Sequence, residues 1–286
     1  MIPASFDYSR PSSLEEALAV LGDAGEEAKV LAGGQSLLPL LRLRLAYPTV
    51  LVDIGRVAEL SGIADRGDHV FIGAMTTHHE VVRSPIVNEH CPLVALATAT
   101  VADRAVRHRG TFGGSLAHAD PAGDLPAVAL ALDMDLVARS STGERTIPAA
   151  DFFVDYLEPA LEPGEILVGA RVPKLGQGWG FHYEKFHRTA QAWATVGVAA
   201  AVRRSNGTVA EARIALTNMG PTPIRAVAVE AAARGAAADR DGALREAAEQ
   251  AAEGTDPPGD LHARPDYRAH LSRVLTHRAL LAACAV

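Results

Sequence analysis

KVLAGGQSLLPLLRLRL, residues 29–45, is the stretch that decides how the first part of the chain folds. KVLA at 29–32 is a short apolar run that favours a buried strand, and the residues after Ser36 have the apolar spacing of a helix. Ala32-Gly33-Gly34-Gln35-Ser36 therefore lies where a strand gives way to a helix. Because the first N–H groups of a helix have no partner within it, we expect this turn to hold an anion.

A second glycine pair follows further along the chain, in Thr111-Phe112-Gly113-Gly114-Ser115. One such pair is a weak signal, since glycine turns are common. Two pairs, each followed by a serine, indicate that both turns hold one pyrophosphate, because a phosphate can approach the backbone closely where there is no Cβ. Neither turn reads G-x-G-x-x-G and no P-loop is present, so the sequence predicts nucleotide binding by another architecture.

Local signals predict the start and end of several helices. Ser12 and Ser13, with Glu15 and Glu16, form overlapping capping boxes for a first helix, which Gly22 and Gly25 are expected to end. Thr77 and Glu80 form another box, before a helix that starts at His78.

Strand-like runs follow in the middle of the chain and after it. We expect strands at 49–54, 69–76, 135–140, 165–173 and 180–188. Asn206-Gly207 joins two further β-compatible runs and predicts a hairpin. Proline and glycine cluster between 174 and 178, which indicates a domain boundary near that point.

The composition limits the class of protein. A chain of 286 residues suits two domains, or one large domain with subdivisions. Its net charge of −7 argues against a nucleic-acid surface, which depends on clustered Lys and Arg. The first residues have no signal-peptide pattern and no apolar run is long enough for a transmembrane segment, so we expect a cytoplasmic protein. Cys91 and Cys284 are the only two cysteines, too few for a four-cysteine iron–sulfur or zinc site.

Several polar residues are candidates for chemistry, and most have a plain structural alternative. His78, His79 and Glu80 lack the spacing of a zinc motif, so we expect a solvated helical turn and no metal site. His118 follows the second glycine turn closely enough to reach a bound ligand. Asp124 stands at the head of a helix, where its position alone leaves open whether it caps that helix or binds a ligand hydroxyl.

The basic run at 107–109 and the tryptophan at 193 are also ambiguous. Arg107, His108 and Arg109 could balance ligand phosphates or form a solvated basic corner. Trp193, eight residues after Lys185, could be a core or interface residue or a ring stacked on a planar cofactor. No G-x-S-x-G elbow occurs, so the sequence gives little support for a hydrolase.

Taken in order, these motifs resemble a known family. AGGQS at 32–36, IGAMTTHHE at 72–80, TFGGS at 111–115 and GDLPA at 123–127 are followed by EPGEILV, YEKF and ALTNMGPTP. Together they resemble the FAD-binding medium subunit of molybdenum hydroxylases, the xanthine dehydrogenase family. Within it, the likeness is greatest to the flavoprotein subunits of aerobic carbon monoxide dehydrogenases.

The resemblance implies an α+β fold in two domains. Residues 1–176 would form an FAD-binding domain of the vanillyl-alcohol oxidase (PCMH) type, with lobes at about 1–56 and 57–176. Residues 177–286 would form a smaller domain with a three-stranded antiparallel sheet and a helical bundle.

The resemblance also implies which residues bind FAD, with no catalytic residue and no metal ligand in this chain. The pyrophosphate would lie between the two glycine turns, Asp124 would bind the polyol, and Trp193 would lie beside the isoalloxazine ring. The complete set is Ala32, Gly33, Gly34, Gln35, Ser36, Leu37, Ala102, Thr111, Gly113, Gly114, Ser115, His118, Asp124, Leu167, Lys185 and Trp193. Gln35, Ser115 and His118 depart from residues common in close relatives, but each can still form hydrogen bonds.

The family implies an electron relay. A small subunit with two [2Fe–2S] clusters would pass electrons from a large molybdenum-cofactor subunit to the flavin, and an external acceptor such as a quinone would take them away. The assembly would be a dimerised heterotrimer, which could lie at the inner face of the membrane as a peripheral complex. The alternatives are a self-contained vanillyl-alcohol-oxidase-type oxidoreductase, the same subunit in a heterocycle or aldehyde dehydrogenase, and a nucleotide-binding scaffold without enzymatic activity.

Overall fold

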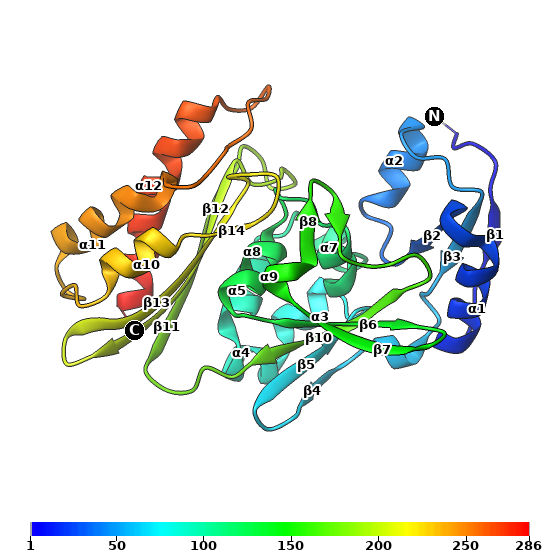
Figure 1. The fold of residues 1–286 in the computed structure, drawn as a ribbon, viewed down its shortest axis with the longest axis horizontal. Helices are drawn as coiled ribbons and strands as arrows, with labels where there is room; N and C mark the ends of the chain where they lie inside the picture. The colour runs from blue at the N-terminus through cyan, green and yellow to red at the C-terminus, as the bar shows by residue number, and fades with distance from the viewer. Residues whose placement is uncertain (1, 286) are drawn as a thin grey trace.

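The computed structural model describes residues 2–285 and places three main sheets one after another along the molecule (Figure 1). The first lobe contains a three-stranded parallel sheet in which β3 lies between β1 and β2. Its elements are β1 (Asp7–Ser9), α1 (Leu14–Ala24), the 3₁₀ turn η1 (Gly25–Glu27), β2 (Ala28–Leu31), α2 (Leu37–Leu43) and β3 (Val50–Asp53). The strands expected at 29–32 and 49–54 are present, each shifted by no more than one residue.

Helix α1 is capped by the predicted residues. The Ser13 hydroxyl accepts from the Glu16 N–H (3.2 Å), and the Glu16 carboxylate accepts from the Ser12 N–H (2.8 Å). The helix ends at Gly25, whose φ of 61° is the left-handed conformation that glycine adopts easily. The expectation that Gly22 also ends it was wrong, because a helix can continue through one glycine at a modest cost.

The second lobe contains a five-stranded antiparallel sheet in the order β4-β5-β10-β6-β7. Its strands are β4 (Ile63–Asp65), β5 (His69–Gly73), β6 (Asp135–Ser140), β7 (Gly143–Pro148) and β10 (Ile166–Pro173). The helical elements of this lobe are η2 (Ala58–Leu60), α3 (His78–Arg83), α4 (Pro85–His90), α5 (Pro92–Ala99), α6 (Arg104–Arg107), α7 (Phe112–Ala117), α8 (Asp124–Ala131) and α9 (Ala149–Phe152). A short hairpin of β8 (Phe153–Asp155) and β9 (Glu158–Pro159) precedes β10.

The capping box predicted for α3 is present in full. The Thr77 hydroxyl accepts from the Glu80 N–H (3.2 Å), and the Glu80 carboxylate accepts from the Thr77 N–H (2.8 Å). This box fixes the start of α3 immediately after β5, and so fixes the backbone on which His78 lies.

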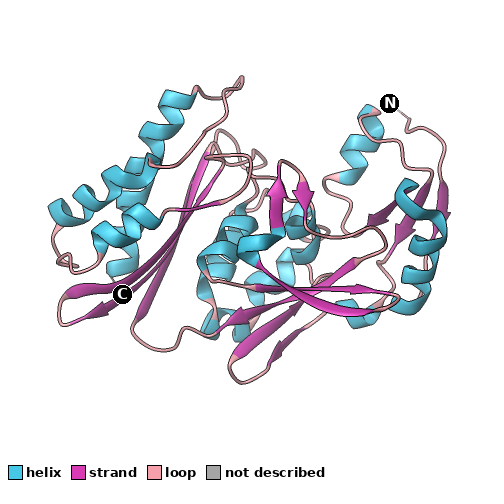
Figure 2. Cartoon of the chain, in the orientation of Figure 1, coloured by secondary structure: helices cyan, strands magenta, loops and turns pink. Residues whose placement is uncertain are grey.

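The C-terminal part is a four-stranded antiparallel sheet with helices on both faces (Figure 2). The strands are β11 (Trp179–Phe186), β12 (Val196–Ser205), β13 (Thr208–Thr217) and the two-residue β14 (Ile224–Arg225). The helical elements are α10 (Val227–Ala233), α11 (Asp241–Ala248), η3 (Glu249–Ala252) and α12 (Pro265–Cys284). The sheet therefore has the three long strands that were expected, with β14 added at one edge.

Asn206 and Gly207 form the turn between β12 and β13, as their sequence predicts. Both have positive φ, 50° and 76°. A two-residue hairpin turn with positive φ at both positions follows the natural twist of the strands.

Strand β12 joins two hydrophobic cores, because alternate side chains of a strand point to opposite faces. Ala199 and Ala201 belong to the core of the second lobe, which also contains α5 and α8. Val198, Ala200 and Val202 belong to the core beneath α10, α11 and α12. The C-terminal sheet is thus packed directly against the second lobe.

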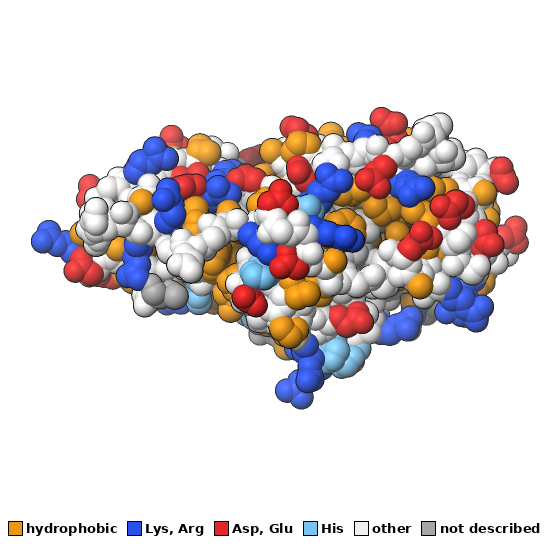
Figure 3. All heavy atoms as spheres, turned by 90° about the horizontal axis from the view of Figure 1, so that it is seen from below, with side chains coloured by type: hydrophobic (Ala, Val, Ile, Leu, Met, Phe, Trp, Pro, Cys, Tyr) orange, Lys and Arg blue, Asp and Glu red, His pale blue; other side chains and the backbone are white. Residues whose placement is uncertain are grey.

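None of the helices within residues 2–285 is long and apolar enough to cross a bilayer. On the face shown in Figure 3, acidic and basic side chains are interspersed with apolar ones, so that face has no broad area of one charge sign.

Candidate functional site

One cavity, of about 670 Å³, lies where the first lobe, the second lobe and the C-terminal sheet meet. All of the residues proposed from the sequence as cofactor ligands line it. They are Ala32, Gly33, Gly34, Gln35, Ser36, Leu37, Ala102, Thr111, Gly113, Gly114, Ser115, His118, Asp124, Leu167, Lys185 and Trp193. Residues far apart in the sequence are therefore brought together at one site.

The first glycine turn, residues 32–36, connects β2 to α2 and has unoccupied backbone donors. Within residues 2–285, the N–H groups of Gly33, Gly34, Gln35 and Ser36 make no hydrogen bond. Gly34 has a φ of 73°, which turns the chain into the helix. Ser36 precedes α2, but its side chain forms no capping bond. Free N–H groups that line a cavity at the start of a helix are donors for an anion.

The second glycine turn, residues 111–115, differs because its N–H groups are already bonded. The Gly113 N–H donates to the Ala74 carbonyl (2.8 Å) and the Gly114 N–H donates to the Thr111 hydroxyl (3.1 Å). The Ser115 N–H donates to the Thr111 carbonyl (3.1 Å). The expectation of free N–H groups at both turns was therefore wrong for these residues, because they lie in the first turn of α7, where Ala74, just after β5, and Thr111 supply acceptors.

The glycines are also required for a reason that the sequence did not reveal. A Cβ on Gly33 would lie 2.2 Å from the Arg109 carbonyl oxygen, and one on Gly113 would lie 2.4 Å from the Ala74 Cβ. A Cβ on Gly114 would lie 2.6 Å from the Thr111 hydroxyl. At each position the nearest obstacle to a side chain is protein, so these glycines allow the two turns to pack against their neighbours.

Asp124 is the first residue of α8 and is bonded across to the C-terminal sheet. Its Oδ1 accepts from the Tyr183 hydroxyl (2.8 Å) and its Oδ2 accepts from Lys185 Nζ (2.7 Å). The two side chains of the ion pair are only 3% and 4% exposed. Asp124 makes no capping bond to α8, so the structure favours the alternative in which it faces the cavity.

Burial raises the pKa of Asp124, although Lys185 and Tyr183 act in the opposite direction. Lys185 also donates to the Thr100 carbonyl (3.2 Å), so its ammonium group bridges the second lobe and β11. A carboxylate has room for about four hydrogen bonds, and two of these are used here. Oxygen lone pairs therefore remain for a ligand hydroxyl.

His78 is a cavity residue that the sequence interpretation placed in a solvated turn. It is 4% exposed, and its Nδ1 has no hydrogen-bond partner in the described chain. Burial, and to a smaller extent the charge of Arg107, lowers the pKa of His78 to about 4. The ring is therefore neutral at pH 7. The capping box at Thr77 could have located this backbone, but no sequence signal showed that the ring is buried.

The other histidines near the site divide into two kinds. His118 is partly buried, and burial lowers its pKa. Its ring centroid lies 6.3 Å from that of Trp193. His79 stacks on His108 instead, at 3.9 Å, outside the cavity lining. Within residues 2–285 no group of three potential metal-ligating side chains comes together.

Trp193 lies on the connection between β11 and β12, and its residue surface is 53% exposed. Gln191 and Ala192 of the same connection also line the cavity, though the sequence interpretation missed both.

Arg107 has a structural position: its guanidinium donates to the carbonyls of Val101 and Ala102 (2.8 and 3.0 Å). Neither it nor His108 or Arg109 lines the cavity.

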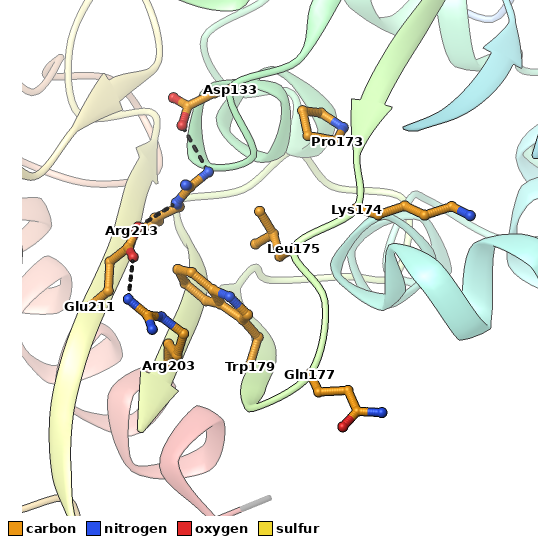
Figure 4. Close-up of a pocket in the computed structure, with 9 residues that line it drawn as sticks. All are labelled: Asp133, Pro173, Lys174, Leu175, Gln177, Trp179, Arg203, Glu211 and Arg213. Atoms are coloured by element: carbon orange, nitrogen blue, oxygen red, sulfur yellow. Dashed lines mark hydrogen bonds and ion pairs between the residues drawn. The ribbon is translucent and has the colours of Figure 1, made fainter. Parts of the chain in front are cut away.

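A second hollow lies on the outer side of the joint between the second lobe and the C-terminal sheet (Figure 4). Its charged groups bond to one another: Arg213 pairs with Asp133 (2.9 Å) and Glu211 (3.1 Å). Glu211 also pairs with Arg203 (3.1 Å), and both arginines approach the Trp179 ring. These partly exposed ion pairs therefore link the second lobe to the C-terminal sheet, and they leave few polar groups in the hollow for a ligand.

The chemistry of the main cavity fits FAD. The N–H groups of the first turn suit a pyrophosphate, and the Asp124 carboxylate suits the hydroxyls of a polyol. Leu167 and Trp193 provide an apolar and an aromatic surface for a planar ring. The neutral His78 has an unpaired ring nitrogen for a further hydrogen bond.

Comparisons with known proteins agree with this fit. Residues 4–175 match the family model "FAD binding domain in molybdopterin dehydrogenase", and residues 181–283 match "CO dehydrogenase flavoprotein C-terminal domain". The two models together span nearly the whole chain.

Individual relatives match over their full length. The carbon monoxide dehydrogenase medium chain of Hydrogenophaga pseudoflava is 43% identical over 285 residues, which are 100% of this chain and 99% of the relative. The alpha subunit of the 6-hydroxypseudooxynicotine dehydrogenase complex of Paenarthrobacter nicotinovorans is 39% identical, over 98% of this chain and 95% of the relative. A solved carbon monoxide dehydrogenase from H. pseudoflava superposes with a TM-score of 0.96, at 45% identity, covering 100% of this chain and 99% of that one. The chain therefore belongs to the family of FAD-binding medium subunits of molybdenum hydroxylases.

Proposed function

We propose that this chain is the FAD-binding, electron-transferring medium subunit of an aerobic carbon monoxide dehydrogenase. One observation carries the proposal: all of the residues expected to bind FAD line a single cavity, in a chain that matches carbon monoxide dehydrogenase medium chains from end to end. The division into an FAD-binding domain at 1–176 and a C-terminal domain at 177–286 is part of the same proposal, as are lobes of about 1–56 and 57–176.

Each part of the cavity has a proposed partner in the cofactor. The pyrophosphate is bound by the N–H groups of the first turn and by the side chains of Thr111 and Ser115 in the second. The polyol is bound by Asp124, whose position Lys185 fixes. The isoalloxazine ring, which can accept and release electrons, lies beside Trp193. The residues of this chain bind and orient FAD, and none needs to contact the substrate of the complex.

Electron transfer requires partners, because this chain has no ligand set for an iron–sulfur cluster. Its relatives are medium subunits of multi-subunit molybdenum hydroxylases. We infer that a small subunit with [2Fe–2S] clusters delivers electrons, and that a large molybdenum subunit oxidises the substrate. The electrons then leave to an external acceptor such as a quinone. We further propose a dimerised heterotrimer in the cytoplasm, in which the complex associates with the inner face of the membrane.

A second candidate function is the same subunit in a dehydrogenase for a heterocycle or an aldehyde. Relatives named for 6-hydroxypseudooxynicotine, glyceraldehyde and nicotine match 96–98% of this chain at 34–39% identity. In either case FAD and the electron path stay the same, and the substrate is set by the molybdenum subunit. Turnover of carbon monoxide by the assembled complex separates the two candidates.

The test of the cofactor site is FAD retention after purification. The native chain is expected to be yellow, with FAD close to stoichiometric. Gly33→Val is expected to lose FAD, because its side chain would push the two turns apart at the Arg109 carbonyl. Gly114→Val is also expected to lose FAD, because its Cβ would lie 2.6 Å from the Thr111 hydroxyl of the same turn and would displace it. Gly22→Val is the matched control, since a Cβ at that position would meet no atom within 4 Å apart from the adjacent backbone of α1.

Full flavin occupancy in both cavity variants would contradict the placement of the pyrophosphate. A native chain that is colourless and takes up no FAD would instead favour a scaffold without redox activity.

A further inference from the structure

The segment ALTNMGPTP, residues 215–223, contains no cavity-lining residue, although it helps to define the family resemblance. It begins as the end of β13 and turns at Asn218, whose φ is 62°. Asparagine tolerates this left-handed conformation better than most residues. Asn218 is 8% exposed, so its polar atoms are placed inside the protein.

Asn218 bonds to two segments that border the cavity. Its backbone N–H donates to the Pro121 carbonyl (2.7 Å), in the segment that leads to Asp124. Its side-chain Nδ2 donates to the Ala194 carbonyl (2.7 Å), one residue after Trp193. One buried residue therefore connects the start of α8 with the connection between β11 and β12.

Its neighbour strengthens the same link. Thr217 is buried, and its hydroxyl lies 3.2 Å from the Tyr183 hydroxyl, which donates to Asp124. Thr217 and Asn218 thus bond to the segments that carry Asp124, Tyr183 and Trp193, although neither residue lines the cavity.

The connection that carries Trp193 has few other supports. Residues 187–195 contain no helix or strand. The Thr195 N–H donates to the Phe186 carbonyl (2.8 Å), and Arg268 donates to the Thr195 carbonyl. On the other side of Trp193, the Ala192 N–H donates to the Thr189 carbonyl (2.9 Å) within the connection, and Gln191 donates to Asp103. Among residues 2–285, Asn218 makes the side-chain hydrogen bond nearest to Trp193 along the chain, at Ala194.

We propose that Asn218 is a positioning residue that holds Trp193 over the cofactor cavity. The direct effect is on Trp193 itself and needs no cofactor. The effect on a bound flavin rests on the proposed function. Without the amide, the Ala194 carbonyl loses its buried donor and residues 191–194 gain freedom to move.

The test compares two asparagine-to-glycine substitutions in a Trp179→Phe background, where Trp193 is the single tryptophan. Asn218→Gly keeps the left-handed backbone and the N–H but removes the amide. Asn206→Gly is the matched control, because Asn206 also has a positive φ, 50°, but lies in the β12–β13 turn. Asn218→Asp is the second variant, with the same shape and without the donor.

The first measurement is made on FAD-free protein. Both Asn218 variants are expected to lower the fluorescence anisotropy of Trp193 and to increase its quenching by acrylamide, while Asn206→Gly changes neither. Equal anisotropy in all variants, or an equal change in the control, would overturn the proposal.

The second measurement is made on FAD-loaded protein. An aromatic ring close to a flavin quenches its fluorescence, so both Asn218 variants are expected to show brighter bound flavin at unchanged occupancy. If Trp193 becomes mobile but flavin brightness stays the same, the positioning of Trp193 stands and the placement of the flavin ring beside it fails.

Discussion

The two glycine-rich turns look alike in sequence and differ in what their backbones do. AGGQS at 32–36 precedes α2, whereas TFGGS at 111–115 consists of the N-cap and the first residues of α7. Both motifs line the cavity. The first leaves its N–H groups without partners, whereas those of Gly113, Gly114 and Ser115 are bonded within the protein. We infer that the first turn binds the anion through its backbone, while the second is a scaffold that presents side chains.

The difference arises from the neighbours of each turn. The second turn follows β5 closely in space, so Ala74 and Thr76 provide carbonyl acceptors and Thr111 provides a hydroxyl. The first turn leaves β2, and no acceptor in residues 2–285 reaches its N–H groups. A glycine pair near the start of a helix is therefore evidence that another group approaches the backbone closely. Only the surrounding structure decides whether that group is a ligand or another part of the protein.

The largest expected effect is a loss of stability at low pH, caused by the protonation of His78 beside the second turn. His78 donates its N–H to the Gly110 carbonyl, and its buried ring packs beside Gly110, just before that turn. The pKa of His78 is about 4, below its ordinary value of 6.5, so the unfolded chain binds more protons between these values. The contribution of neutral His78 to the free energy of unfolding is fully present above pH 6.5, and about 3 kcal/mol of it is lost as the pH falls to 4.

Urea unfolding of the FAD-free chain between pH 7.5 and pH 4, compared with the variant His78→Gln, measures this contribution. Glutamine does not titrate, so the variant is expected to have a flatter pH dependence. If the native and variant curves run parallel, His78 is not the group that makes the second turn sensitive to acid.

Gly113→Ala is expected to have the next largest effect. The added Cβ would lie 2.4 Å from the Ala74 Cβ and 2.6 Å from its Cα, so the backbone of the turn or of residue 74 must shift. Such overpacking costs about 1–3 kcal/mol. Urea unfolding without FAD should show the loss. Gly22→Ala in α1 is the control, and it should be neutral or stabilising by about 0.5–1 kcal/mol; equal losses in the two variants would remove the distinction.

The smallest expected effect is a difference in stability between variants at the two N-cap residues, Ser36 before α2 and Thr111 before α7. Thr111 caps α7 through its hydroxyl, so Thr111→Ala should cost about 1 kcal/mol in the absence of FAD. Ser36 precedes α2 without a side-chain capping bond, so Ser36→Ala should lie within about 0.5 kcal/mol of the native chain. Thermal unfolding of both variants tests this order, and a larger loss for Ser36→Ala would reverse our assignment of scaffold and binding turn.

Local signals in the sequence predicted much of the fold. The capping box at Thr77, the Ser13 side-chain cap, the strand before Ala32 and the hairpin at Asn206-Gly207 are all present, because each depends on residues near one another in the chain. The fold class and the cofactor came from the ordered motifs of the family. They agree with the family models and with a solved structure at a TM-score of 0.96.

The remainder depended on contacts between distant segments. Nothing near His78 in the sequence shows that its ring is buried, and nothing near Tyr183 shows that it bonds to Asp124. The free and bonded N–H groups of the two turns depend on Ala74 and Thr76, which belong to another segment. Tertiary partners of this kind cannot be found from periodicity or capping patterns alone.

The measurement that tests the central claim most directly is the reduction of bound flavin by carbon monoxide, followed by flavin absorbance under anaerobic conditions. The isolated chain, loaded with FAD, is predicted to stay oxidised. The chain assembled with its iron–sulfur and molybdenum subunits is predicted to bleach. Bleaching of the isolated chain by the same substrate would contradict the account, because the chemistry would then lie on this polypeptide and not on its partner.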